Sequence, residues 1–264
     1  MVHHGEGRQG PGLGRLSVVR HGESVANAVF ARAVATGDAG LVVEGTDARV
    51  GLSERGVREA RALGRWLAGA GAERPGLAVV SPYVRARQTW EAMAVAAGRA
   101  GAEVPAALVD ERLRDREMGV LELLPPPAVA ARAPEEAARR ERLGEWFYRP
   151  PGGESLADVV LRVRDFLTEL RADPPCAHVL LVAHDSVAVA VRQVLAGIGA
   201  PPAQDVPVPN ASVSVWERAP AGGDFADGGP TGGDPADGRR LRLVEFGGVR
   251  HLGAECGHGR GTEA

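Results

Sequence analysis

Apolar residues in this chain fall into two kinds of segment, and the two kinds alternate. The first kind is a short run of mainly apolar residues, which is typical of a strand buried on both faces of a sheet. Runs of this kind occupy 16–20, 77–80, 106–109 and 179–183. Strands of this character predict a mostly parallel central sheet that is covered on both faces.

The second kind of segment is longer, and its apolar residues recur every three or four positions, as on one face of an α-helix. Ser53 opens the first of these segments and is a suitable N-cap, and Glu154 or Ser155 holds the same place in a later one. The predicted helices cover 53–70, 84–97, 154–171 and 187–195. Helices interleaved with strands in this order predict an α/β fold, a three-layer α/β/α sandwich.

Residues 120–150 interrupt this alternation. They contain the triplet Pro125-Pro126-Pro127, a charged helix-like stretch at 134–143 and the aromatic cluster Trp146-Phe147-Tyr148. We predict an α-helical insertion between two core elements. Two interpretations are open: a lid, or a surface subdomain without a catalytic role. The aromatic cluster would pack against the core or, as the less favoured alternative, line a substrate pocket.

A second irregular region, 219–239, is rich in Gly, Asp, Pro and Ala, and Gly-Gly-Asp-Phe-Ala-Asp-Gly is echoed there by Gly-Gly-Asp-Pro-Ala-Asp-Gly. Such low complexity predicts a mobile loop. The loop separates two strand-like runs, 212–216 and 241–246, which would pair as a hairpin. We expect a disordered leader at 1–15 and a disordered tail at 253–264, so that a single domain spans 16–252.

Composition narrows the range of functions. The chain has 264 residues, of which 44% are hydrophobic, and a net charge of −3, so no basic excess supports nucleic-acid binding. Its two cysteines, Cys176 and Cys256, lie far apart, which argues against a disulfide framework and a cysteine-based metal site. No stretch approaches the roughly 18 apolar residues of a membrane span, and the first residues contain no apolar signal segment. We therefore expect a cytoplasmic protein without a membrane partner.

Three polar motifs directly follow predicted parallel strands. Arg20-His21-Gly22-Glu23 follows the first strand, 81–89 follows the second, and His184-Asp185-Ser186 follows the run at 179–183. Because ligands bind at the carboxyl edge of such sheets, these motifs would converge. Two arginines and two histidines would then form an electropositive pocket that suits a phosphate dianion.

The first motif supplies the parts needed for attack on phosphorus. The imidazole of His21 can act as a nucleophile, and the guanidinium of Arg20 can hold phosphate oxygens in a bidentate fork. Gly22 would let the backbone approach an anion closely. In the second motif, either Arg85 or Arg87 would face the site, with the other at the surface.

Three features of the sequence carry a resemblance to a known family. They are Arg20-His21-Gly22-Glu23, the segment Ser81-Pro82-Tyr83-Val84-Arg85-Ala86-Arg87-Gln88-Thr89, and the late strand followed by His184. Together they resemble the motifs of the histidine phosphatase superfamily. The resemblance is to the branch related to cofactor-dependent phosphoglycerate mutase, and it runs from about Leu16 to Ser214. It implies the phosphoglycerate mutase-like fold and phosphoryl transfer through a phosphohistidine.

The resemblance also implies roles for individual residues. His21 would attack phosphorus, while Arg20, Arg85 and His184 would clamp the phosphate oxygens. Asn27 matches the asparagine that contacts the phosphoryl group. Asp115 falls at the place of the proton donor. Arginines would neutralise the phosphate charge, so we expect no metal and no other cofactor.

The sequence leaves the identity of the acid open, because Glu111 and Glu117 compete with Asp115. Asp115 must be protonated in the first step. A bound phosphate dianion would raise its pKa, whereas Arg114 and Arg116 would lower that pKa if they point inward.

Two departures from the family pattern bear on function. No tryptophan lies between Glu23 and Asn27, and the sugar-phosphate-binding elements of a mutase are not recognisable, which favours hydrolysis. His184 is followed by Asp185 instead of the commoner glycine, which adds negative charge beside the phosphate unless Asp185 turns away or pairs with an arginine.

We therefore predict a phosphatase that hydrolyses phosphate monoesters through a phosphohistidine on His21. The alternatives are a phosphoglycerate-type mutase or sugar bisphosphatase, and a non-catalytic phosphate-binding regulatory module. The substrate would be a phosphorylated small molecule or a phosphoprotein, and the sequence leaves the oligomeric state open.

Overall fold

The computed structural model describes residues 12–202, 207–218 and 240–253. Six strands form one sheet in these residues, in the spatial order β3-β2-β4-β1-β5-β6. The strands are β1 (Arg15–Arg20), β2 (Leu77–Val80), β3 (Ala107–Val109), β4 (His178–Ala183), β5 (Val213–Arg218) and β6 (Leu241–Gly248).

The sheet is mostly parallel, as the sequence predicts. Strands β3, β2, β4 and β1 run parallel to their neighbours, with Arg20 opposite Ala183 and Val80 opposite Val182. Strand β5 joins β1 in the antiparallel sense, and β6 pairs antiparallel with β5, which confirms the predicted hairpin. The carboxyl ends of β2, β4 and β1 consequently lie side by side at one edge.

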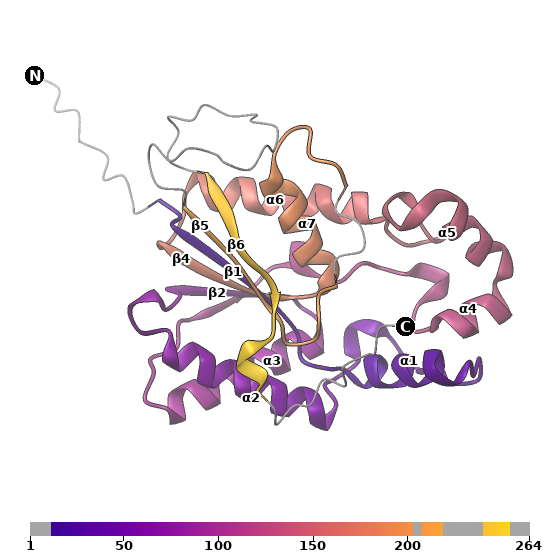
Figure 1. Ribbon diagram of the computed structural model, residues 1–264, viewed down its shortest axis with the longest axis horizontal. Helices are drawn as coiled ribbons and strands as arrows, with labels where there is room; N and C mark the ends of the chain where they lie inside the picture. The colour runs from indigo at the N-terminus through magenta and orange to yellow at the C-terminus, as the bar shows by residue number, and fades with distance from the viewer. Residues whose placement is uncertain (1–11, 203–206, 219–239, 254–264) are drawn as a thin grey trace, which may run out of the picture.

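Helices cover both faces of the sheet and give the predicted three layers. In Figure 1, α6 and α7 lie on one side of the strands and α2 and α3 on the other. The helices are α1 (Val25–Thr36), α2 (Glu54–Gly69), α3 (Val84–Arg99), α4 (Pro126–Arg132), α5 (Pro134–Phe147), α6 (Leu156–Ala172) and α7 (Asp185–Ala196). Among the described residues, no helix combines the length and apolar character that a membrane span requires.

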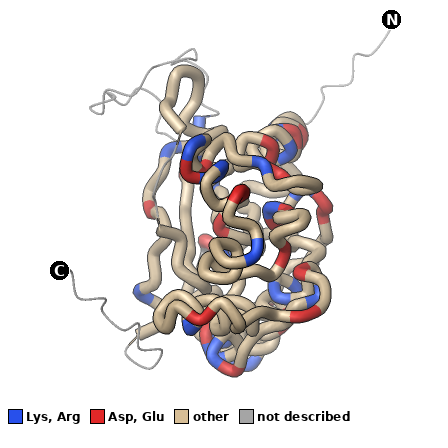
Figure 2. The backbone as a smooth tube through the Cα atoms, turned by 90° about the vertical axis from the view of Figure 1, so that its right-hand side faces the viewer, with Lys and Arg blue, Asp and Glu red and all other residues tan. Residues whose placement is uncertain are grey.

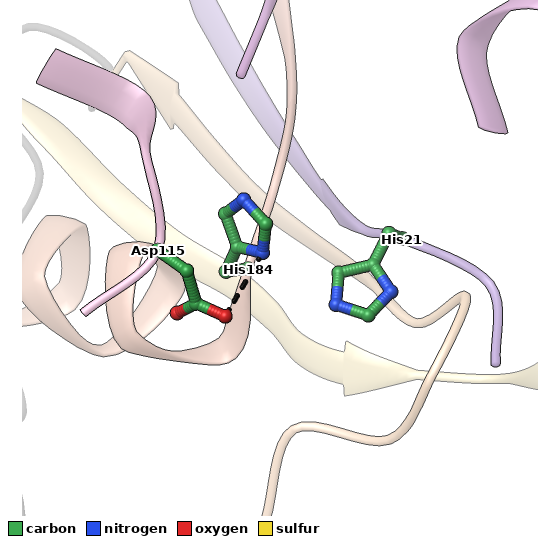
Figure 3. Close-up of side chains that lie close together, drawn as sticks. All are labelled: His21, Asp115 and His184. Carbon is green, nitrogen blue, oxygen red and sulfur yellow. Dashed lines mark ion pairs between the residues drawn. The ribbon is translucent and has the colours of Figure 1, made fainter. Parts of the chain in front are cut away.

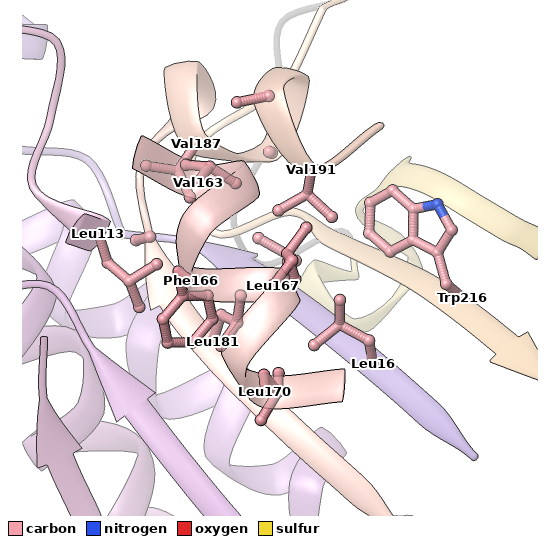
Figure 4. Close-up of a cluster of buried hydrophobic side chains, with 14 of the residues drawn as sticks. Leu16, Leu113, Val163, Phe166, Leu167, Leu170, Leu181, Val187, Val191 and Trp216 are labelled. Atoms are coloured by element: carbon pink, nitrogen blue, oxygen red, sulfur yellow. The ribbon is translucent and has the colours of Figure 1, made fainter. Parts of the chain in front are cut away.

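Each central strand contributes to two separate cores because successive side chains point to opposite faces. In β4, which is buried throughout, Val179 and Leu181 pack with α6 and α7, whereas Leu180 and Val182 pack with α2 and α3. Figure 4 shows the first core, where Phe166 and Leu167 of α6 lie near Leu181. This two-sided burial explains why the strands are continuous apolar runs.

Serine N-caps begin α1, α2 and α6. Ser53 accepts the Gly56 backbone N–H at the start of α2, which confirms the prediction for this residue. Ser155 caps α6, so this helix begins after Glu154 instead of including it. Helix α1, capped by Ser24, is absent from the predictions because alanine and valine occur on several of its sides, and only Ala26 and Ala33 are buried.

The predicted insertion is helical and consists mainly of α4 and α5, with Gly144 interrupting α5 at a φ of 73°. At the start of the chain, Leu13 is buried and Arg15 begins β1, so residues 12–15 belong to the fold and not to a leader. Residues 1–11, the predicted loop at 219–239 and residues 254–264 of the predicted tail lie outside the described residues.

Candidate active site

The three predicted motifs meet at the carboxyl edge of the sheet. His21 directly follows β1, Arg85 lies in the first turn of α3 after β2, and His184 follows β4 at the N-terminus of α7. In Figure 3, His21, His184 and Asp115 come together from three separate segments of the chain. The imidazole rings of His21 and His184 have centroids 5.1 Å apart.

His21 is buried, with 2% of its surface exposed, and its tautomer follows from its hydrogen bonds. Its Nδ1 lies 2.7 Å from the carbonyl oxygen of Gly22, which can only accept, so Nδ1 carries the proton. The lone pair therefore resides on Nε2, and Arg85 Nε donates to this atom at 3.2 Å. Burial, followed by the charges of His184, Arg85 and Arg20, holds the pKa of His21 well below 6.5. At neutral pH the ring is therefore uncharged, and the lone pair of Nε2 could act as a nucleophile.

The orientation of His184 is set by Ser81. The Oγ of Ser81 accepts the Tyr83 backbone N–H and lies 2.8 Å from His184 Nε2. Nδ1 of His184 lies 3.1 Å from Asp115 Oδ2, which can only accept, so Nδ1 carries the hydrogen and Nε2 of the neutral ring accepts from the Ser81 hydroxyl. Burial lowers the pKa of His184, although Asp115 acts in the opposite direction. The sequence motif contained Ser81 but gave no sign of this role.

Asp115 is the acid that the fold brings to the centre. Its Oδ2 accepts from Arg85 Nη2 at 2.8 Å, and its Oδ1 accepts from the hydroxyl of Ser186 at 2.8 Å. Burial alone would raise the pKa of Asp115, but His184 and Arg85 outweigh burial and hold this pKa well below 3.8. Without a bound anion the carboxyl group is therefore ionised.

The rival acids are exposed, and the flanking arginines bind groups other than the Asp115 carboxylate. Glu117 is exposed and pairs with Arg114 at 3.0 Å, while Glu111 is exposed. The second guanidinium nitrogen of Arg114 binds Glu154, and the guanidinium of Arg116 binds Glu145 and backbone carbonyls. Neither guanidinium has an ion pair with Asp115, so the arginine that lowers its pKa is Arg85.

Arg85 uses all five of its N–H groups. One donates to His21, one to Asp115, and three to Asp47, whose backbone oxygen and carboxylate accept at 2.7, 3.0 and 2.9 Å. Asp47 thus holds the far end of the guanidinium, and the edge formed by Nε and Nη2 faces His21 and Asp115. Arg85 is buried and Arg87 exposed, which confirms that Arg85 is the member of the pair that faces inward.

Asp47 was missed by the sequence reasoning, because it lies in a loop without periodicity or motif. Burial raises the pKa of its carboxyl group, although Arg85 opposes this effect.

Arg20 and Asp185 form an ion pair, which accounts for the aspartate that follows His184 in place of the commoner glycine. Arg20 Nη2 lies 3.3 Å from Asp185 Oδ2, and Arg20 Nη1 donates to the Val208 carbonyl at 2.5 Å. The negative charge of Asp185 is therefore matched by an arginine at the cavity wall.

Asn27 lies at the edge of the site with its amide orientation fixed. Its Oδ1 accepts from the Ser24 backbone N–H at 3.1 Å and from Asn210 Nδ2 at 3.0 Å. Oδ1 can accept both bonds only if the amide nitrogen faces the other way, and Asn27 lines the cavity. Asn210, which also donates to the His21 backbone carbonyl at 3.3 Å, has no sequence signal that marks it as functional.

The structure corrects the expectation that Gly22 serves an approaching anion. Its N–H already donates to Thr89 Oγ1 at 3.1 Å. A Cβ at this position would lie 2.5 Å from the carbonyl oxygen of Gly56, at the start of α2. Gly22 is therefore required for the close packing of this loop against α2.

These groups open into a cavity of about 1690 Å³. One part of its wall is the sheet edge with Arg20, His21 and Arg85, and another part comes from the insertion, including Trp146 and Phe147. The insertion thus contributes directly to the cavity, which favours the first of the two interpretations left open above.

The nitrogen and oxygen atoms of His21, Asp115 and His184 lie within 4.8 Å of one another, a spacing that could hold a metal ion. However, Arg85 donates hydrogen bonds to two of these three residues, so a cation would have to displace a guanidinium. With Arg20 also at the cavity, the arrangement fits an anion better than a metal ion.

Comparison with known proteins agrees with this geometry. The sequence model of the Histidine phosphatase superfamily (branch 1) matches residues 16–227. The chain belongs to this superfamily. The proteins similar to this superfamily member include phosphatases and a mutase.

Curated relatives of this superfamily member include the phosphoglycerate mutase-like protein AT74H of Arabidopsis thaliana, 32% identical over 60% of this chain and 54% of the relative. A 2,3-bisphosphoglycerate-dependent phosphoglycerate mutase of Methylobacterium radiotolerans is 35% identical over 56% of this chain and 68% of its own length. The match spans about half the length of this plant protein and of a second one, the phosphoglycerate mutase-like protein AT74 of Arabidopsis thaliana.

Solved structures share the fold. A mycobacterial glucosyl-3-phosphoglycerate phosphatase, determined with VO3, is 26% identical with a TM-score of 0.64 and covers 89% of this chain and 100% of its own. Bacillus stearothermophilus YhfR has a TM-score of 0.65 at 21% identity, over 90% of this chain and 98% of its own.

Proposed function

We propose that this protein is a phosphatase that hydrolyses phosphate monoesters of small molecules through a phosphohistidine on His21. One observation carries the proposal: the lone pair of His21 Nε2 is directed at the Nε of Arg85, whose neighbouring Nη2 holds Asp115. The nucleophile and the acid therefore both contact one edge of the guanidinium that would bind the phosphate.

In the first step, Nε2 of His21 attacks phosphorus and the bond from phosphorus to the alcohol oxygen breaks. Arg20, Arg85 and His184 Nδ1–H hold the other phosphate oxygens and stabilise the charge of the transition state. Asp115 gives its proton to the departing oxygen. The incoming dianion takes hydrogen bonds from Arg85 and adds negative charge, and both effects raise the pKa of Asp115 so that it can carry this proton.

In the second step, water attacks the phosphohistidine. Asp115, now ionised, accepts a proton from this water, the bond between phosphorus and Nε2 breaks, and inorganic phosphate leaves. His21 returns to its neutral form with the proton still on Nδ1. Asn27, whose amide nitrogen is turned away from Asn210, would donate to the phosphoryl group.

The relative named as a mutase supports a second candidate, in which the phosphoryl group passes to another hydroxyl group instead of water. A mutase would convert 3-phosphoglycerate only in the presence of a bisphosphate primer. The missing tryptophan between Glu23 and Asn27 and the likeness to a phosphatase of known structure favour hydrolysis.

The test is hydrolysis of p-nitrophenyl phosphate in EDTA by the wild-type protein and by His21→Ala, with acid-labile phosphoenzyme measured in parallel. We expect turnover and a labile phosphoprotein in the wild type only. Activity that survives His21→Ala would overturn the mechanism. Conversion of 3-phosphoglycerate that requires 2,3-bisphosphoglycerate would establish the mutase, and phosphate binding without any turnover would establish a binding module.

A further inference from the structure

The cavity is much larger than a phosphate group, so its outer part must contact the alcohol portion of the substrate. The insertion, α1 and the loop before α2 supply this outer part. Its charges and its apolar surface therefore indicate which alcohols the cavity can accept.

The outer wall offers no unpaired cation for a second anionic group. Among the residues that the structure describes, the cavity is lined by three arginines besides Arg20 and Arg85. Arg114 is paired with Glu117 and Glu154. Arg116 and Arg140 both bind Glu145, the latter at 2.6 Å.

Carboxylates outnumber guanidinium groups along the same lining. Besides five arginines, the described lining contains seven acidic residues: Asp47, Glu111, Asp115, Glu117, Glu122, Glu145 and Asp185. His21 adds no charge at neutral pH, because its pKa lies well below 6.5. Figure 2 views the molecule from the side where α4 and α5 lie and shows acidic and basic segments intermingled there. A second carboxylate or phosphate on the substrate would meet net negative charge.

Apolar side chains are available in the same outer part. Phe147 and Leu143 of α5 line the cavity, and 63% and 41% of their surfaces are exposed. Phe30 of α1 and Leu124 of the insertion also line it. Exposed large apolar residues that gather in a cavity are typical of a surface that binds an apolar ligand.

We propose that the substrate is the monophosphate ester of a bulky alcohol that has an aromatic or aliphatic body and no second anionic group. This proposal rests on the phosphatase function proposed above. It distinguishes the protein from enzymes of phosphoglycerates and bisphosphates, whose substrates carry a further carboxylate or phosphate. An uncharged or cationic alcohol fits the net negative outer wall.

The test uses three matched esters: 2-phenylethyl phosphate and its analogues with a carboxylate or an aminomethyl group in the para position. The leaving oxygen is an alkyl alcohol two carbons from the ring in all three, so differences report the outer wall. We expect kcat/KM to fall at least tenfold for the carboxylate and to stay equal or rise for the amine. An equal or higher value for the carboxylate would overturn the proposal while leaving the phosphatase intact. If none of the three esters is hydrolysed although p-nitrophenyl phosphate is, the proposal on the substrate is overturned as well. If p-nitrophenyl phosphate is not hydrolysed either, both the phosphatase function and the proposed substrate class are overturned.

A variant with one charge removed tests the proposal through a ratio of two kcat/KM values, which does not depend on the fraction of folded protein. Glu145→Gln removes the carboxylate that neutralises Arg116 and Arg140. We expect the ratio of kcat/KM for the carboxylated ester to that for the parent ester to rise at least fivefold. Because both values come from the same preparation, partial unfolding cancels. Glu141→Gln, an exposed position of α5 outside the cavity lining, is the matched control and should leave the ratio unchanged. An unchanged ratio in Glu145→Gln would contradict the proposal.

Discussion

The two walls of the cavity are built on different principles. At the sheet edge, His21, Arg85 and His184 are buried, and hydrogen bonds hold both nitrogens of His21, Nε2 of His184 and the guanidinium of Arg85. On the insertion, Phe147 and Leu143 are exposed, and Glu145 pairs with Arg140 at the surface and with the buried Arg116. The first wall is preorganised for one group, and the second is an adaptable surface. Because the two walls belong to different elements, we expect that the phosphoryl chemistry and the choice of alcohol can be altered separately.

The largest effect should come from Asp115→Asn, which keeps the shape of the buried wall but removes its acid. Asparagine cannot accept the proton of the attacking water, so we expect steady-state kcat to fall by about 10²–10⁴-fold. With p-nitrophenyl phosphate, whose leaving group needs little protonation, a burst of one nitrophenol per active site should remain. Stopped-flow absorbance measures both phases, and an unaltered steady-state rate would show that another group is the base.

Arg85→Ala removes the guanidinium that links the nucleophile to the acid. We expect kcat/KM to fall by about 10²–10³-fold, as is common when one donor to a developing charge is lost. Arg87→Ala, two residues away on the exposed side of α3, is the control and should change kcat/KM less than twofold. Equal losses in the two variants would mean that the buried wall does not bind the phosphate through Arg85.

Asp47→Asn tests whether the buried wall depends on a residue that holds Arg85 from behind. The amide keeps one acceptor but loses the charge and one of the two carboxylate contacts, so the guanidinium should lose its fixed orientation. We expect kcat to fall about tenfold through misplacement of the fork. Asp38→Asn, at an exposed loop position, serves as the control. A change in KM alone would instead place Asp47 in substrate contact.

The buried wall should also make stability sensitive to acid. The folded-state pKa of His21 lies well below its usual value of 6.5. Below pH 6.5, His21 is therefore protonated in the unfolded chain but stays neutral in the folded protein. Stability should therefore fall as the pH drops below 6.5. Thermal unfolding between pH 8 and pH 5 should show a lower Tm on the acid side, by a few degrees. His21→Asn should make this profile less steep, while His184, whose pKa burial also lowers, accounts for part of the remaining slope. An equally steep profile in the variant would assign the whole effect to other groups.

The smallest effect belongs to the exposed wall. Phe147→Ala should raise KM for 2-phenylethyl phosphate about threefold to tenfold, because it removes part of one apolar contact. For methyl phosphate, which does not reach α5, kcat and KM should stay unchanged. Steady-state kinetics with the two esters checks this, and equal effects on both would show that the two walls are not separable.

Much of this protein was fixed by short-range patterns in its sequence. The parallel strands, the main helices and the Ser53 cap follow from periodicity and local hydrogen bonding, which act within a few residues. The convergence of His21, Arg85 and His184 also followed, because each motif directly succeeds a strand and parallel strands end at one edge. Asp115 was predictable only through resemblance, since three acids compete in its segment.

The tertiary structure alone decided which partners complete the site. Asp47 lies 38 residues before Arg85, and Asn210 lies 189 residues after His21, yet each forms a hydrogen bond with its distant partner. Both are single polar residues in loops, where no period or motif distinguishes a functional side chain from a solvated one. The pairing of the cavity arginines is likewise invisible in the sequence, because a charge becomes neutralised only when the fold places a carboxylate beside it.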